Sequence, residues 1–123
     1  MPADSTKPKV LVADDEHVIA DTLAMILNKN GFEAHAVYSG DKVLEMAPTL
    51  RPDMLVSDIH MPGVNGIEAA IRIRELLPDI KILLFSGHAA YAGYLEKIRA
   101  KGYEFDFLAK PVHPDDLISR LNT

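Results

Sequence analysis

Short apolar runs alternate along the chain with longer segments whose apolar residues recur at helical spacing. Four runs are dominated by apolar residues, at positions 9–13, 54–58, 81–85 and 105–109. Continuous runs of this kind are typical of strands buried on both faces of a parallel sheet. A fifth run, at positions 33–38, alternates apolar and polar residues, which favours a strand nearer the sheet edge.

A helix is predicted after each strand. The predicted helices begin near position 17, after Ser39, after Asn65, near position 90 and at Pro114. Gly31 is expected to end the first helix, because glycine readily adopts the left-handed conformation found at helix C-termini. Pro48 is expected to stop the second helix, because the residue before a proline disfavours helical backbone. Asn65 and Glu68 have the spacing of a capping box at the start of the third helix.

This alternation of strands and helices indicates an α/β fold with a parallel sheet and helices on both faces. Right-handed crossovers restrict the winding to a few topologies. Residues 1–8, which are polar and include two prolines, are expected to form a flexible N-terminal tail. Residues 9–123 are expected to form a single domain, since no linker or internal repeat interrupts them.

The amino-acid composition argues against several classes of protein. The 123 residues include 18 acidic and 13 basic side chains, a net charge of -5, which argues against direct nucleic-acid binding. The absence of cysteine excludes disulfides and thiolate metal sites. No apolar run is long enough to span a membrane, and the N-terminus lacks the apolar core of a signal peptide, so a cytoplasmic location is expected.

Polar side chains follow several of the predicted strands at the point where each strand ends. They are Asp14 and Asp15 after the first strand, Asp58 after the third, Ser86 after the fourth and Lys110 after the fifth. The carboxyl ends of parallel strands open on one edge of the sheet, where open α/β sheets bind their ligands. We therefore expect three carboxylates, one hydroxyl and one ammonium group to converge there.

Three neighbouring carboxylates need compensating positive charge. Lys110 supplies one charge, and a hard divalent cation with oxygen ligands, Mg²⁺ or Mn²⁺, would supply the rest. The chemistry that uses these groups is phosphoryl transfer to a carboxylate, with Asp58 as nucleophile. Lys110 and the cation would stabilise the transferring oxygens, and Ser86 would donate a hydrogen bond to the attached group.

Five motifs together resemble the receiver domain of two-component response regulators. They are Asp14-Asp15, the segment around Asp58 at positions 57–63, Asn65-Gly66, Ser86-Gly87 and Lys110-Pro111, and the resemblance runs from about position 8 to the end. It implies a flavodoxin-like doubly wound sheet with strand order 2-1-3-4-5. It also implies that a sensor histidine kinase or a phosphotransfer protein phosphorylates Asp58.

The same resemblance assigns further roles. Asp15 and Asp58 would bind Mg²⁺ together with the backbone carbonyl of His60, while Asp14 would act mostly through water. The bond between Lys110 and Pro111 is expected to be cis, a state that costs little only before proline. The protein would be a phosphoacceptor that assists its own phosphorylation and dephosphorylation, not a classical enzyme.

The resemblance also implies which residues would change conformation when Asp58 is phosphorylated. Ser86 and Phe107, which stands three residues before Lys110, match the family's switch positions. Phe107 has no hydroxyl, so any switching must act through packing. The face formed by the fourth helix, the fifth strand and the fifth helix would meet a downstream partner or a second copy of the chain. Most of the aromatic residues fall in this part of the sequence.

Three alternatives remain open. The first is a metal-dependent phosphatase or phosphotransferase that uses Asp58 transiently, although no inserted cap offers a substrate pocket. The second is a nucleotide- or flavin-binding protein, although Asp14 and Asp15 stand where a glycine-rich phosphate loop would be needed. The third is an interaction module that acts without phosphorylation. The side chains of His60 and His88 are expected to face solvent.

Overall fold

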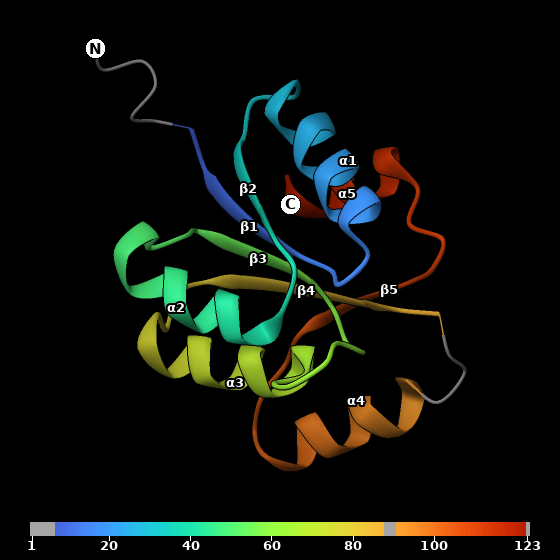
Figure 1. The fold of residues 1–123 in the computed structure, drawn as a ribbon. Helices are drawn as coiled ribbons and strands as arrows, with labels where there is room; N and C mark the ends of the chain where they lie inside the picture. Colours follow the sequence, from blue (N-terminus) through green and yellow to red (C-terminus); the bar gives the residue numbers. More distant parts are fainter. Residues whose placement is uncertain (1–6, 88–90, 123) are drawn as a thin grey trace.

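The structure is a computed structural model, and it describes residues 7–87 and 91–122 (Figure 1). The strands are β1 (Lys9–Ala13), β2 (Glu33–Val37), β3 (Met54–Asp58), β4 (Lys81–Ser86) and β5 (Asp106–Ala109). The helices are α1 (His17–Asn28), α2 (Gly40–Leu50), α3 (Gly66–Leu76), α4 (Tyr91–Ala100) and α5 (Pro114–Leu121). Among the described residues no helix is long and apolar enough to cross a membrane. The predicted start of α4 at position 90, His88 and positions 1–6 of the predicted tail lie outside the described residues.

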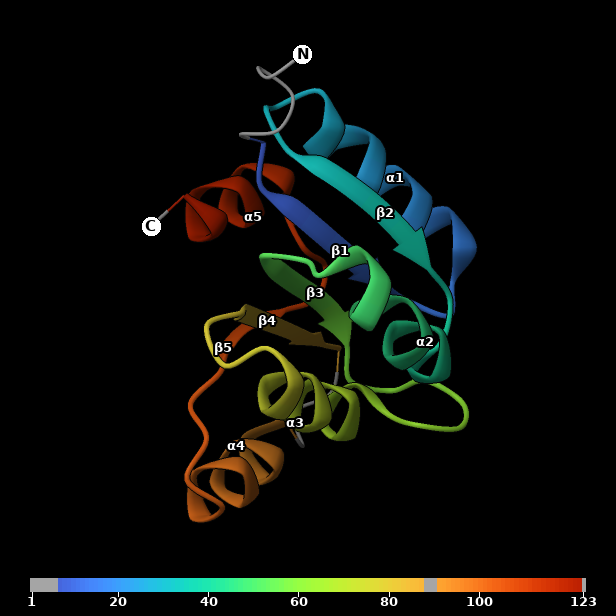
Figure 2. The same cartoon turned by 90° about the vertical axis from the view of Figure 1, so that its left-hand side faces the viewer.

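All strand pairs are parallel, and the sheet has the order β2-β1-β3-β4-β5. This confirms the predicted α/β fold and strand order, including the position of β2 at an edge. Helices α1 and α5 cover one face of the sheet, and α2, α3 and α4 cover the other (Figure 1, Figure 2).

The central strands are apolar because both of their faces are buried. Val10 and Val12 of β1 pack under α1 and α5, whereas Leu11 packs under α2 and α3, and all three are fully buried. Alternate residues of one strand therefore enter two separate cores. Burial on both faces explains the continuous apolar pattern from which the strands were predicted.

The register aligns the ends of the strands that carry the polar residues. Ala13 of β1 lies beside Ser57 of β3, and Asp58 lies beside Phe85 of β4. Ser86, in turn, lies beside Ala109 of β5. The residues at these ends consequently open on a single edge of the sheet.

Helix α2 differs from its prediction, because it continues through Pro48 to Leu50. Pro48 lies in the last turn, so the hydrogen bond that its missing N–H removes and the crowding by its ring affect only the end of the helix. Arg51 then ends the helix in a left-handed conformation (φ 51°), and its N–H donates to the Ala47 carbonyl at 2.8 Å. The buried Ala47 holds this turn against the core.

The two predicted N-caps are present. The Ser39 hydroxyl accepts from the N–H of Lys42 at 3.1 Å, and the Asn65 side chain accepts from the N–H of Glu68 at 2.9 Å. The reciprocal half of the predicted capping box is replaced by an ion pair, because the Glu68 carboxylate contacts Arg72 one turn further along α3.

Candidate functional site

The carboxyl edge of the sheet brings together the three aspartates predicted to meet there. Carboxylate oxygens of Asp14, Asp15 and Asp58 all lie within 4.8 Å of one another. Asp14 is fully buried and Asp58 is 5% exposed, whereas Asp15 is exposed. Asp14 and Asp58 reach the same point because β1 and β3 are adjacent strands in register.

Lys110 reaches this cluster from the end of β5. Its Nζ lies 3.2 Å from an oxygen of Asp58 and 3.4 Å from an oxygen of Asp14. The Lys110 N–H donates to the Ser86 carbonyl at 3.0 Å, and Nζ lies 5.3 Å from the centre of the Phe85 ring. The side chain therefore crosses the end of β4 to place one positive charge between two carboxylates.

The surroundings of Asp14 and Lys110 raise the pKa of both groups. Burial raises the pKa of the Asp14 carboxyl, the Glu16 N–H opposes this rise, Asp58 adds to it and Lys110 opposes it. Burial lowers the pKa of Lys110, but the Asp58 and Asp14 carboxylates outweigh it, so the net shift is upward. Lys110 is thus held as an ammonium ion at neutral pH.

The residues fit a hard divalent cation. One oxygen of Asp14 accepts from the Glu16 N–H at 2.9 Å, whereas its other oxygen is buried without a hydrogen bond from any described residue. The contact of that oxygen with Lys110 is an ion pair, not a hydrogen bond of good geometry. A cluster of three carboxylates with one cation and one unsatisfied buried oxygen has the donor set that Mg²⁺ or Mn²⁺ prefers.

A hollow of about 340 Å³ opens over this cluster. It is lined by Asp15, Glu16, Asp58, His60, Gly87 and Lys110. The exposed side chain of His60 lies at this hollow, as expected of a loop residue facing solvent.

The remaining predicted residues lie around the cluster. Ser86 is 2% exposed at the end of β4 and is not among the residues that line the hollow. Phe107 is half-buried and packs against the core on the α2–α3 side. The Lys110–Pro111 peptide bond is cis.

Two residues that support Asp58 were not singled out for that role from the sequence. The buried Ser57 hydroxyl donates to the Asp58 carbonyl at 2.9 Å. A Cβ atom added to Gly66 would lie 2.0 Å from the same carbonyl oxygen, so the start of α3 packs directly on the end of β3. The signal available in the sequence was a glycine immediately after the Asn65 N-cap, where most residues are tolerated.

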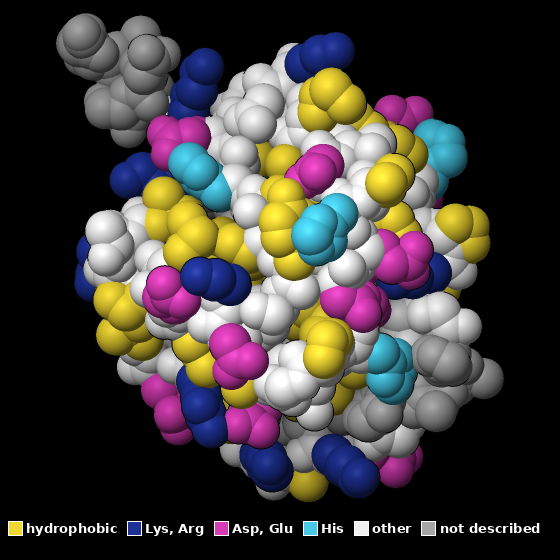
Figure 3. All heavy atoms as spheres, in the orientation of Figure 1, with side chains coloured by type: hydrophobic (Ala, Val, Ile, Leu, Met, Phe, Trp, Pro, Cys, Tyr) yellow, Lys and Arg dark blue, Asp and Glu magenta, His cyan; other side chains and the backbone are white. Residues whose placement is uncertain are grey.

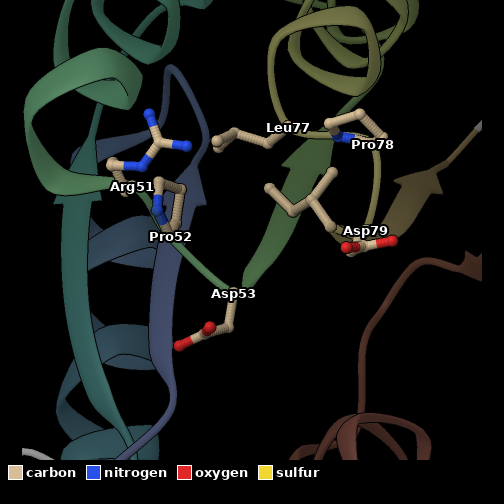
Figure 4. A pocket seen from close by; sticks show the side chains of 7 residues that line it. Arg51, Pro52, Asp53, Leu77, Pro78 and Asp79 are labelled. Carbon is tan, nitrogen blue, oxygen red and sulfur yellow. The ribbon is translucent and has the colours of Figure 1, made fainter.

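A second polar hollow, of about 350 Å³, lies at the opposite end of the strands. Arg51, Asp53, Pro78 and Asp79 line it together with Pro52, Leu77 and Ile80 (Figure 4). The Arg51, Asp53 and Asp79 side chains point in different directions in this view, and Asp53 accepts from the N–H of Lys9 at 2.8 Å. The charged groups there do not converge on a common point.

Proteins of similar sequence fall into one family. The profile of the response regulator receiver domain matches residues 10–122. The chain is 34% identical over 115 residues to the chemotaxis protein CheY of Thermotoga maritima, covering 93% of this chain and 94% of that protein. It is 30% identical over 113 residues to the response regulator MprA of Mycobacterium ulcerans, covering 92% of this chain and 48% of that protein.

A solved structure shares the same fold. The chemotaxis protein CheY4 of Vibrio cholerae superimposes with a TM-score of 0.85 at 26% identity, covering 95% of this chain and 98% of that chain. Sequence, fold and the arrangement of carboxylates around Lys110 lead to one conclusion: the chain belongs to the receiver domain family of two-component response regulators.

Proposed function

We propose that this chain is a phosphorylation-activated signalling switch in which Asp58 accepts a phosphoryl group. The observation that carries the proposal is the 3.2 Å contact between Lys110 Nζ and the Asp58 carboxylate inside the acidic cluster. Asp58 lines the hollow, so a phosphorus atom can approach its carboxylate from solvent. The donor is a sensor histidine kinase or a phosphotransfer protein.

In the proposed step, an Asp58 oxygen forms a bond to phosphorus while the bond between phosphorus and the donor imidazole nitrogen breaks. The electron pair of that bond returns to the imidazole. Lys110 holds its proton and stabilises negative charge on the transferring oxygens. Asp15, Asp58 and the His60 carbonyl would hold Mg²⁺ or Mn²⁺, with Asp14 acting mostly through water. When bound, the cation neutralises phosphoryl oxygen charge.

The apolar surface beside Lys110 supports a protein donor. A groove of about 340 Å³ between α1 and the β5–α5 loop is lined mainly by apolar side chains, among them Val18, Ile19 and Pro111. Val18 is 78% exposed. An apolar surface that borders the hollow fits a protein that presents its phosphorylated side chain to Asp58. The net charge of -5 argues against nucleic acid as the direct partner.

The proposed output is a change in the face formed by α4, β5 and α5. Once phosphorylated, Asp58 would recruit the Ser86 hydroxyl and Lys110 through charge-assisted hydrogen bonds. Ser86 lies beside Ala109 of β5, and Phe107, two residues earlier in β5, packs against the core on the α2–α3 side, so the change would reach β5 through the packing of Phe107. A downstream partner or a second copy would then bind this face. The protein acts in the cytoplasm and turns over no separate substrate.

Intact mass spectrometry after incubation with acetyl phosphate tests the proposal. We expect a single phosphoryl adduct that requires Mg²⁺ and is absent from Asp58→Asn. If no adduct forms, phosphate release is measured to detect fast hydrolysis. Absence of both adduct and release would contradict the proposal, and release unchanged in Asp58→Asn would place the chemistry elsewhere.

A further inference from the structure

A groove between α3 and α4 lies apart from the acidic cluster. Its volume is about 180 Å³, and it is lined by Asn65, Ile67, Ile71, Lys97, Ile98 and Lys101. Ile67 and Ile71 stand one turn apart on α3 and are half-buried, while Ile98 of α4 is 1% exposed. The floor of the groove is therefore a short apolar strip that runs along α3.

Two lysines edge this strip. Lys97 and Lys101 are one turn apart, and both are exposed. Neither makes an ion pair or a hydrogen bond with any described residue. The two acids of α3 have other partners, because Glu68 pairs with Arg72 and Glu75 accepts from the Tyr103 hydroxyl at 3.3 Å. The two ammonium groups are thus available to a ligand that enters the groove.

The end of α4 is basic in an otherwise acidic chain. Positions 96–101 carry Lys97, Arg99 and Lys101 against the single acid Glu96, whereas the whole chain has a net charge of -5. Lys and Arg side chains, with Asp and Glu side chains beside them, lie at the lower edge of the molecule, where α4 is placed (Figure 3). A local excess of one sign favours a partner of the opposite sign.

Most of the described side chains of helix α4 are exposed. Among its described side chains, at positions 93 and 96–100, only Ile98 is buried. A ligand that covers Ile67, Ile71 and the stems of the lysines would bury apolar area that the chain leaves exposed. The apolar floor distinguishes this site from a simple phosphate-binding patch, because a nucleic-acid backbone offers nothing apolar to cover it.

We propose that the α3–α4 groove binds an acidic amphipathic helix of a partner protein. Apolar side chains spaced one turn apart would cover Ile67 and Ile71, and carboxylates one turn apart would pair with Lys97 and Lys101. This binding goes beyond the proposed switch and does not depend on phosphorylation of Asp58. It is therefore tested on the unphosphorylated full chain.

The probe is a fluorescent synthetic helix with leucines on one face and glutamates beside them, compared with a matched helix that carries lysines in place of the glutamates. Fluorescence anisotropy at low salt is expected to show tighter binding of the glutamate helix than of the lysine helix. Added salt should weaken the binding of the glutamate helix, because it screens the charges. The double variant Lys97→Glu/Lys101→Glu is expected to bind it about tenfold more weakly, from the loss of two exposed pairs and the new repulsion.

Controls keep the result interpretable. Lys29→Glu reverses an exposed charge on the other side of the sheet and should leave binding unchanged. Ile71→Ala, checked by circular dichroism, should weaken both helices through the loss of apolar contact. Equal binding of the two helices, or no effect of the double reversal, would overturn the proposal. Stronger binding of a single-stranded oligonucleotide than of the glutamate helix would overturn it in favour of a nucleic-acid site.

Discussion

The side-chain amide of Asn28 bonds to both backbone polar groups of Ala34. Asn28, the last residue of α1, accepts from the Ala34 N–H at 2.8 Å and donates to its carbonyl at 3.1 Å. The N–H of Glu33 and the carbonyl of Val37 bond toward β1, so Ala34 between them faces the open edge of the sheet. Asn28 thus takes the place that a neighbouring strand would occupy.

Asn28→Ala is expected to lower the free energy of unfolding by about 1–2 kcal/mol, because it leaves two backbone groups of a buried residue without partners. Urea unfolding measures the loss, and amide exchange at Ala34 should accelerate. Asn30→Ala is the matched control, since the Asn30 side chain donates to the Ile26 carbonyl at 2.7 Å in an exposed hydrogen bond. Equal losses in both variants would show that the edge of β2 does not depend on Asn28.

Gly66→Ala should separate α3 from the end of β3. The added Cβ would lie 2.0 Å from the Asp58 carbonyl oxygen. Because that oxygen belongs to the backbone, the backbone must move to relieve the clash. We expect a loss of about 1–3 kcal/mol in unfolding free energy and weaker phosphorylation of Asp58.

Gly93→Ala provides the control for Gly66→Ala, because a Cβ at Gly93 meets nothing within 4 Å. Gly93 is a helical position of α4, so its substitution by alanine should raise the free energy of unfolding by about 0.5–1 kcal/mol. Urea unfolding of both variants decides the matter. A Gly66→Ala protein as stable as wild type would mean that the close contact relaxes without cost.

Asp14→Asn should remove the pH-dependent cost of burying the Asp14 carboxylate. Burial raises the pKa of Asp14 above its unfolded value, so its contribution to stability is present at low pH and lost as the pH rises through the folded pKa. In the absence of divalent metal we therefore expect Asp14→Asn to be more stable than wild type at neutral pH. The difference should vanish below about pH 4, the ordinary pKa of aspartate.

Urea unfolding in the presence of a chelator, repeated across that pH range, measures this difference. A gain that does not change with pH would point to packing of the amide and not to titration. A variant less stable than wild type at neutral pH would mean that the Asp14–Lys110 pair outweighs the cost of burying the carboxylate.

Mg²⁺ should raise the thermal unfolding midpoint of the wild type with increasing concentration, since a ligand that binds only the folded chain stabilises it. Asp15 is exposed, so Asp15→Asn should leave the metal-free midpoint unchanged and reduce the Mg²⁺-dependent rise. Asp79→Asn removes an exposed carboxylate at the opposite end of the strands and should retain the full rise. An identical rise in all three proteins would exclude the acidic cluster as the metal site.

The sequence by itself determined the fold and the edge of the sheet on which the polar residues gather. Strands buried on both faces must be apolar along their whole length, so β1, β3 and β4 were recognisable without any partner. Parallel strands in a right-handed winding put their carboxyl ends together, which predicted the meeting of Asp14, Asp58 and Lys110. Local chemistry also located the caps at Ser39 and Asn65.

Only the tertiary structure decided which of these side chains are buried and which atoms touch. Asp14 and Asp15 are neighbours in the chain, yet one is fully buried and the other exposed, because successive residues leave a strand end in opposite directions. Pro48 is accommodated within α2 because the core holds Ala47 and the left-handed Arg51 closes the last turn. Gly66 and Asn28 acquire their roles from atoms that only packing brings near. Lys110 and Asp58 are 52 positions apart in the sequence, and their side chains are 3.2 Å apart in the structure. The packing of whole strands sets this contact, because no local pattern links two such distant positions.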